Sequence, residues 1–265
     1  FPGATNTMTT EAMMGDGKAL QMGTSHELGQ NFARAFEIVY QDAEASQQLV
    51  WTTSWGVSTR MMGGLIMAHG DDAGLRLPPR LAPTQVVILV VRAGDGVGER
   101  ARLIAEALRT AGVRVAVDDR VDVGFGRRAT AWELKGVPVR IELGPRDLEN
   151  EEATVVRRDE PGKATVGLSA LTGHVTGLLG AIQTAMLEAA RARRDERTVD
   201  AGGVAEAIDA AATGFARMRW EDLDAEGLAA LKAEGVTVRC LQGPDGDVAA
   251  SDDEPGSVAT VARSY

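Results

Sequence analysis

The sequence predicts a multidomain chain of mixed α/β and α+β architecture. Residues 1–82 contain paired extended segments with helical stretches between them, residues 83–190 alternate strand and helix, and residues 191–265 mix both on a smaller scale. Three prolines between positions 78 and 83 mark the first boundary, because a proline confines its predecessor to extended geometry. We therefore expect three structural parts.

Composition and charge exclude several classes of protein. Hydrophobic residues make up 44% and charged residues 25% of the 265 positions, which excludes wholesale disorder. The net charge of −10 argues against a general nucleic-acid binder, DNA-binding proteins included. The charge is uneven, however, since residues 83–148 are mildly basic and residues 195–265 carry nearly all the excess acid. No apolar run reaches the roughly 18 residues of a membrane span, so we expect no membrane partner.

Residues 1–82 are predicted to form an antiparallel sheet with helices. The Gly15-Asp16-Gly17 turn joins two extended segments, which indicates a hairpin. A later pair of short extended segments predicts a second hairpin. The expected elements are strands at 7–14, 19–26, 39–41 and 48–53, and helices at 28–36 and 59–69.

Residues 83–190 are predicted to form an α/β module with partly parallel pairing, because strands and amphipathic helices alternate. Strands are expected at 85–91, 113–117 and 137–143, with helices at 97–108 and 127–135. An Ala- and Leu-rich stretch predicts a long helix at 171–196. The last part is expected to contain helices at 204–212 and 223–234, a strand at 236–241 and a loop at 243–256.

One glycine motif suggests a nucleotide-binding loop. Gly94-Asp95-Gly96-Val97-Gly98 follows a strand and opens a helix, and Asp118 and Asp119 end the next strand, as in a dinucleotide fold. The third glycine is not at its usual place, and Asp95 would put a carboxylate beside a pyrophosphate. We therefore favour a plain turn, with both strand-end acids solvated. A dinucleotide-dependent oxidoreductase remains a rival interpretation, which predicts NAD binding.

Two segments are rich in hydrogen-bonding side chains. Residues 21–32 place Thr24 and His26 at alternate positions of an extended segment, so both side chains lie on one sheet face. Residues 53–60 place Arg60 at the start of a helix, after Gly56. A guanidinium can hydrogen-bond a phosphate and stack on a base.

These segments resemble a known family. The stretches FPGATNTMTTEAMMGDGKALQMGTSHELGQNFARAF, WTTSWGVSTRMMGGLIMAHGDDAGLRLPPRLAPTQVVI and WELKGVPVRIELGPRDLE are similar to class II prolyl-tRNA synthetases of the archaeal/eukaryotic-like subtype, as is the terminal Ser264-Tyr265. The resemblance implies that residues 1–82 are the C-terminal part of the catalytic domain with motif 3. It implies an anticodon-binding domain at 83–190 and a C-terminal domain at 191–265. The class motifs 1 and 2 are not in this sequence.

The resemblance also implies roles for individual residues. Arg60 matches the catalytic arginine of motif 3, which binds ATP. Gln21, Thr24 and Ser58 match further ATP-binding positions. The proline-binding positions are His26, Trp55 and Gly56, although Trp55 could equally be core. The anticodon-binding positions are Glu133, Arg140 and Arg146, since a carboxylate and arginines suit the two guanines that end a proline anticodon.

The implied activity is that of a cytoplasmic proline–tRNA ligase, which forms prolyl-adenylate and transfers proline to the 3′ end of proline tRNA. The implied cofactors are ATP and Mg²⁺, the partners are L-proline and proline tRNA, and motif 1 would make the full enzyme a homodimer. Without motifs 1 and 2, this segment is expected to be inactive alone. No zinc is expected, because Glu221 and Glu226 stand at cysteine positions of zinc-binding relatives and Cys240 is the only thiol. The alternative is a non-catalytic anticodon-binding module or paralogue.

Overall fold

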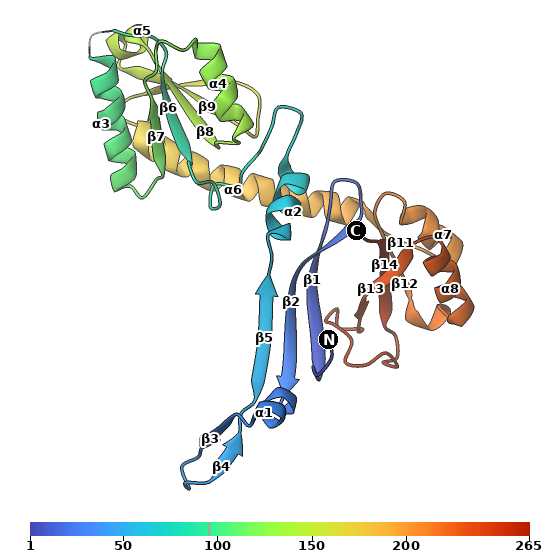
Figure 1. Ribbon diagram of the computed structural model, residues 1–265. Coiled ribbons are helices and arrows are strands. Elements are labelled where there is room, and N and C mark those ends of the chain that lie inside the picture. Colours follow the sequence, from blue (N-terminus) through green and yellow to red (C-terminus); the bar gives the residue numbers. More distant parts are fainter. Residues whose placement is uncertain (95) are drawn as a thin grey trace. The chain divides into compact units, whose positions relative to one another are not determined.

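The computed structural model describes residues 1–94 and 96–265 (Figure 1). Contacts within the chain divide it into two compact units. Unit 1 combines Phe1–Ala68 with Arg193–Tyr265, and unit 2 is His69–Ala192. None of the helices in the described part of the chain is both long and apolar enough to cross a bilayer.

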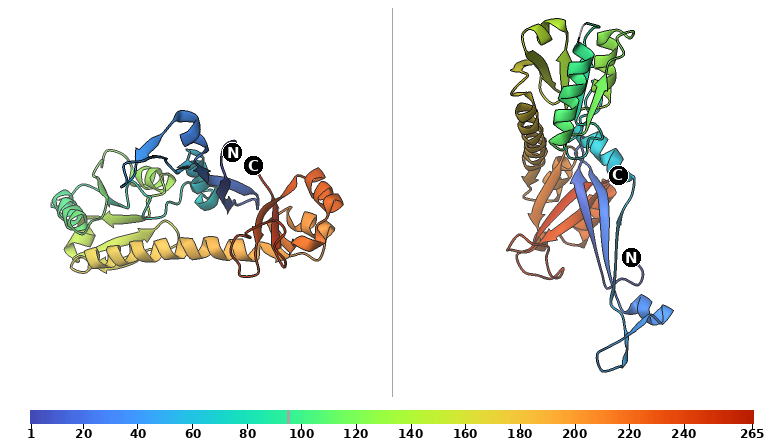
Figure 2. Two further views of the ribbon diagram at one scale, coloured as in Figure 1. Left: turned by 90° about the horizontal axis from the view of Figure 1, so that it is seen from below. Right: turned by 90° about the vertical axis from the view of Figure 1, so that its left-hand side faces the viewer.

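The first half of unit 1 is built on an antiparallel sheet. Its order is β1 (Asn6–Met13), β2 (Ala19–Gly29) and β5 (Thr52–Val57). Helix α1 (Asn31–Phe36) and the hairpin of β3 (Val39–Gln41) and β4 (Gln47–Leu49) lie between β2 and β5 in the chain. Figure 1 and the right-hand view of Figure 2 show them beyond the end of β2, and α2 (Arg60–His69) follows β5 in the chain.

The second half of unit 1 is a four-stranded sheet with two helices. Its strand order is β11 (Thr198–Asp200), β12 (Phe215–Arg219), β14 (Val258–Arg263) and β13 (Val236–Gln242). Helices α7 (Val204–Ala210) and α8 (Ala225–Ala233) supply Ala207 and Leu231 to its buried core, and the single turn η1 (Trp220–Asp222) follows β12.

Unit 2 is a mixed five-stranded sheet with helices on both faces. Its order is β10 (Ala164–Gly167), β9 (Glu152–Arg157), β8 (Val139–Leu143), β6 (Val86–Val90) and β7 (Val115–Asp118). Strand β6 runs parallel to β7 and β8, whereas β9 is antiparallel to β8 and β10 is antiparallel to β9. The helices are α3 (Val97–Thr110), α4 (Phe125–Leu134), α5 (Pro145–Glu149) and α6 (Leu171–Glu196).

The central strand β6 explains the two helical layers. All five of its side chains are buried, as expected for a strand covered on both faces. Val86, Ile88 and Val90 belong to the core shared with α3 and α6. Val87 and Leu89 belong to a smaller core with Ala129 of α4 and Val137. The period-two alternation of a strand therefore divides one apolar run between two cores.

Several predicted elements are confirmed, and others are wrong. The helix at 171–196 and the strand at 39–41 have the expected bounds. The expected strand at 48–53 is wrong, because β4 ends at Leu49 and a separate strand, β5, pairs with β2. The helix expected at 28–36 begins only at Asn31, since β2 continues to Gly29. The elements that were not predicted are β9, β10, β11, β12, β14, η1 and α5. The three-part division at 82 and 190 stays a prediction, and α6 continues unbroken through residue 190.

The strand-end acids near the glycine loop that precedes α3 do not both fit a dinucleotide site. Asp95 lies outside the described residues. The expectation that Asp118 is a solvated acid is wrong, because it is 3% exposed and accepts hydrogen bonds from Arg120 and Trp132. A carboxylate engaged in this way is not available to a ribose hydroxyl. Asp119, by contrast, is half exposed and pairs with Arg102 at 3.1 Å.

Candidate functional site

Seven of the residues predicted from the sequence meet at one open depression of unit 1, here called the β2–β5 depression. Strand β2 supplies Gln21, Thr24 and His26, and β5 supplies Trp55 and Gly56. Ser58 lies in the connection after β5, and Arg60 is the first residue of α2. The sheet and the start of α2 thus bring together residues that are up to 39 positions apart in the chain.

Strand register determines which side chains share a face. Thr24 pairs with Gly56, and His26 pairs with Ser54, so these four positions lie on the same side of the sheet. A methyl group at Gly56 would meet no atom within 4 Å, which leaves open space opposite Thr24. Trp55 pairs with Ser25, and alternation turns its side chain to the other face. Trp55 is 78% exposed, so it is not part of a core within this chain.

Arg60 is an accessible cation at the rim of the depression. Its backbone N–H donates to Ser58 Oγ at 3.3 Å, and its guanidinium Nη1 donates to the Gln21 carbonyl at 3.5 Å. Gln21 Nε2 in turn donates to Thr24 Oγ1 at 3.0 Å. Among the described residues, no carboxylate forms an ion pair with Arg60. Its charge is therefore available to a bound anion.

His26 is held in one orientation by two neighbours. Its Nδ1 shares a hydrogen bond with Thr7 Oγ1 at 2.9 Å, and its ring stacks on Phe1 with the ring centres 4.4 Å apart. A fixed imidazole that is only half buried can shape a small-molecule site.

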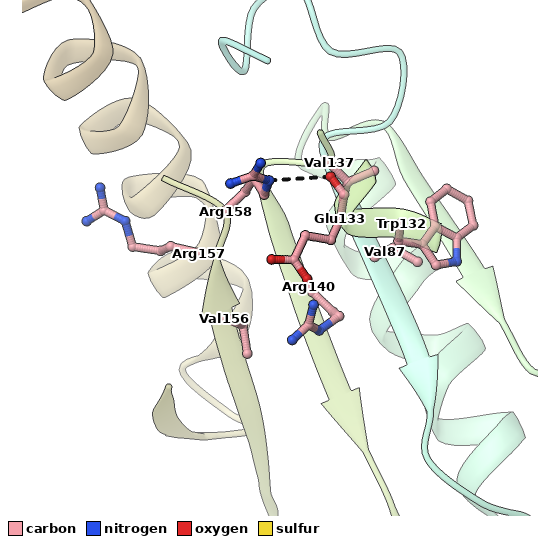
Figure 3. Close-up of a pocket in the computed structure, with 8 residues that line it drawn as sticks. All are labelled: Val87, Trp132, Glu133, Val137, Arg140, Val156, Arg157 and Arg158. Carbon is pink, nitrogen blue, oxygen red and sulfur yellow. Dashed lines mark hydrogen bonds between the residues drawn. The ribbon is translucent and has the colours of Figure 1, made fainter. Parts of the chain in front are cut away.

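A second candidate site lies in unit 2, in a pocket here called the arginine pocket (Figure 3). Its volume is about 50 Å³. Glu133 comes from the last turn of α4 and Arg140 from β8, while Arg157 ends β9 and Arg158 follows it. The remaining lining is apolar or aromatic, and consists of Val87, Trp132, Val137 and Val156.

The arginines of the arginine pocket form ion pairs with nearby carboxylates, whereas the Glu133 carboxylate does not take part in one among the described residues. Arg140 Nε donates to Glu142 Oε1 at 3.0 Å, and Arg157 binds Asp159 at 2.6 Å, an interaction that raises the arginine's pKa. No hydrogen bond or ion pair engages the Glu133 carboxylate within residues 1–94 and 96–265. A free carboxylate beside arginines and an indole can accept the N–H groups of a planar heterocycle while the cations face its acceptors.

The third predicted anticodon residue is not brought into this pocket. Arg146 lies on α5, is exposed, and does not line the space shared by Glu133 and Arg140. Sequence reasoning missed Arg157 and Arg158. Their signal is the Arg-Arg pair that ends the alternating segment of β9.

Comparisons with known proteins find an anticodon-binding domain in this chain and similarity to proline–tRNA ligases. The sequence family described as "Anticodon binding domain" matches residues 85–177. "Proline--tRNA ligase 2" of Streptomyces avermitilis is 56% identical over the whole chain, which covers 56% of that relative. A relative of the same activity name from Frankia casuarinae is 57% identical, with 57% of its length covered. A solved prolyl-tRNA synthetase of Cryptosporidium parvum, complexed with L-proline and AMP, superposes with a TM-score of 0.85 at 30% identity over all of this chain and 59% of that one. The chain therefore spans less than two thirds of the relatives it matches.

Proposed function

Since the chain is homologous over its whole length to class II prolyl-tRNA synthetases, we propose that it forms the C-terminal portion of a proline–tRNA ligase. Residues 1–82 contribute motif 3 to the catalytic domain, residues 83–190 read the anticodon, and residues 191–265 form the C-terminal domain. The observation that carries the proposal is the convergence of seven predicted residues on the β2–β5 depression.

We assign ATP to the part of the depression next to α2. Arg60, with no ion-pair partner among the described residues, stabilises phosphate charge, while Gln21, Thr24 and Ser58 offer hydrogen bonds to the nucleotide. The described lining of the depression carries no carboxylate, so Mg²⁺ would arrive on the ATP phosphates rather than be held by these residues.

We assign L-proline to the part of the depression around His26 and Gly56, and Trp55 borders it through its backbone, because its side chain turns to the other face of the sheet. The proline carboxylate attacks the α-phosphorus of ATP in line, a new oxygen–phosphorus bond forms, and pyrophosphate leaves. No proton needs to move in this step, so the rate depends on positioning and on charge stabilisation.

The catalytic proposal is tested by proline-dependent exchange of pyrophosphate into ATP. We expect no exchange from this chain alone, because its sequence holds motif 3 but not motifs 1 and 2, and because Trp55 and Val57 are left 78% and 69% exposed by the described residues. Fusing the part of the Streptomyces avermitilis relative that this chain does not cover in front of Phe1 is expected to give exchange that Arg60→Ala lowers about 100-fold. Robust exchange by the chain alone, or an unaffected Arg60→Ala fusion, would contradict the proposal.

We further propose that Glu133 and Arg140 read the guanines of the proline anticodon, with Arg146 contacting the RNA outside the pocket. The free carboxylate of Glu133 suits guanine's N–H donors, and an arginine suits its O6 and N7 acceptors. Glu133→Ala is expected to weaken proline tRNA binding about tenfold more than binding of an anticodon-swapped tRNA. Equal losses for both RNAs would show that the contacts are merely electrostatic.

A non-catalytic anticodon-binding module is the second candidate. It is favoured by one observation, namely that the matched anticodon domain, 85–177, lies wholly inside the compact unit His69–Ala192. It predicts selective tRNA binding with no exchange activity even in the fusion.

Homodimerisation through motif 1 and the absence of zinc also remain proposals. No group of three potential metal-ligating side chains gathers in the part of the chain that the structure describes. Glu221 is engaged by Arg219 at 3.0 Å, and Cys240 is a lone free thiol. Elemental analysis that finds one zinc per chain would contradict the zinc proposal, and light scattering of the fusion tests the dimer.

A further inference from the structure

The end of helix α4, which carries Glu133, is held by a segment that precedes the α/β module. The last carbonyls of a helix have no partners inside it. Here the Leu134 carbonyl accepts the Leu75 N–H at 3.1 Å, and the Gly136 carbonyl accepts the Leu77 N–H at 3.3 Å. The residues from 71 to 77 therefore complete the hydrogen bonding of the helix end.

One side chain joins this segment to the pocket. Arg158 Nε donates to the Glu133 carbonyl at 3.3 Å, and Nη2 donates to the Gly74 carbonyl at 3.3 Å. The same guanidinium binds the Asp71 carboxylate through both Nη atoms, one of them at 2.9 Å. The Arg158 side chain is only 9% exposed, and its hydrogen bonds lower the pKa of Asp71, which keeps the pair ionised.

Residues 71–77 can lie this close to the end of α4 because of the backbone conformation of the turn from Asp71 to Gly74. Asp71 and Gly74 exchange two backbone hydrogen bonds of 3.0 Å, which closes a tight turn. Gly74 has a φ of +120°, and a methyl group there would lie 2.6 Å from Leu134 Cα. The turn thus fits against the helix end without a gap, and the Asp71–Arg158 pair fastens it there.

We propose that the Asp71–Arg158 pair is a positioning latch for anticodon discrimination, which fixes the backbone of Glu133 so that its free carboxylate meets the base edge. The proposal rests on the proposed anticodon reading by Glu133. Asp71 does not line the arginine pocket whereas Arg158 does, so the Asp71 variant separates positioning from direct contact with the RNA. A guanidinium that bridges three acceptors cannot be replaced by the point charge of a lysine.

The test measures the Kd of the full chain for a proline anticodon stem-loop and for one with the two guanines swapped, by fluorescence anisotropy. Asp71→Asn and Arg158→Lys cut the latch from opposite sides, and each is expected to lower the ratio of the two affinities about five- to tenfold. Asp119→Asn, which removes the exposed Arg102 pair of the same unit, is the matched control and should leave the ratio unchanged.

A double-mutant cycle separates positioning from general stability. In a Glu133→Gln background, Asp71→Asn should cause no further loss of the ratio, because the latch acts through that carboxylate. If the wild-type chain discriminates but both latch variants keep its ratio, or if the losses add in the cycle, the latch is wrong and the anticodon proposal stands. If the wild-type chain does not discriminate at all, the anticodon proposal fails and the latch falls with it.

Discussion

At the scale of single residues, the buried charges of unit 2 lie beside the arginine pocket. Arg128 is 1% exposed, yet each of its three guanidinium nitrogens donates a hydrogen bond. The acceptors are the carbonyls of Val123, Asp118 and Val90, at 2.8–3.0 Å. The Asp118 carboxylate accepts from Arg120 at 2.6 Å and from Trp132 Nε1 at 2.7 Å. This network links the ends of β6 and β7 to α4, the helix that carries Glu133.

Removing the charge of Asp118 should destabilise unit 2. Asp118→Asn leaves the buried Arg128 without its nearest negative charge, and we expect a loss of about 3 kcal/mol in the free energy of unfolding by urea. Asp119→Asn is the matched control, because its ion pair with Arg102 is exposed and should cost less than about 0.5 kcal/mol. Similar losses for the two variants would contradict the argument.

The same carboxylate gives the stability a pH dependence. The hydrogen bonds and charge of Arg120 hold the pKa of Asp118 far below its usual value. A depressed pKa in the folded state stabilises the fold above the unfolded pKa, about 3.9, and this contribution is lost as the pH falls toward the folded value. Urea titrations below about pH 4 should therefore show a steeper loss for the wild type than for Asp118→Asn.

Residue types in a local pattern identified much of the candidate site, but not all of it. Thr24 and His26 were predicted from strand alternation and Arg60 from its place at a helix start, whereas Gln21 was predicted only from the family resemblance. Asp71 and Arg158 are 87 positions apart, and although Asp71 lies in a stretch that resembles the family, no local pattern relates it to Arg158. Their pairing depends on the tertiary fold, which no local pattern encodes.

At the scale of elements, the β1–β2 hairpin is held by the C-terminal half of unit 1. Arg197 Nη1 donates to the Gly15 carbonyl at 2.8 Å, and the Tyr265 hydroxyl donates to Asp16 at 2.7 Å. Gly17 has a φ of +85° and lies against Thr213. Because β2 carries Gln21 and Thr24, this contact also supports the register of the β2–β5 depression.

A methyl group at Gly17 should therefore be poorly tolerated. It would lie 2.2 Å from the Thr213 backbone, so the hairpin or its neighbour must move. We expect Gly17→Ala to lower the free energy of unfolding by at least about 2 kcal/mol. Gly235→Ala is the control in the same unit, since φ is +71° there but no atom lies within 4 Å. Its cost should be only the backbone strain, about 1 kcal/mol, and equal costs at both positions would refute the contact argument.

The elements that the sequence predicts well are those with a strong local period. Helix α6 repeats buried Leu171, Val175, Leu179, Ile182 and Met186 on one face, so its bounds were predicted correctly. Strand β5 has mostly exposed side chains, and only its pairing with β2 defines it. Strand β9 has charged residues at both ends, and β10 is a four-residue edge strand, so both give only a weak local pattern.

At the scale of the whole molecule, the net charge of −10 would repel RNA, whereas the arginine pocket proposed to bind the anticodon carries three arginines. In the proposed function, discrimination between anticodons depends on a few placed side chains, whereas the overall electrostatic field would act on the rate of encounter. Asp245, Asp247, Asp252 and Asp253 belong to an acidic stretch of unit 1 that contributes to the field and does not line the arginine pocket.

Neutralising this stretch should change rate but not selectivity. Replacing the four aspartates by asparagine is expected to raise the association rate constant for the proline anticodon stem-loop several-fold at low salt, because long-range repulsion falls. The gain should vanish near 0.5 M salt, where charges are screened within a few ångströms. The ratio of affinities for proline and swapped stem-loops should stay constant, since Glu133 and Arg140 are untouched. Stopped-flow fluorescence measures both quantities, and a changed ratio would show that the acidic stretch takes part in recognition itself.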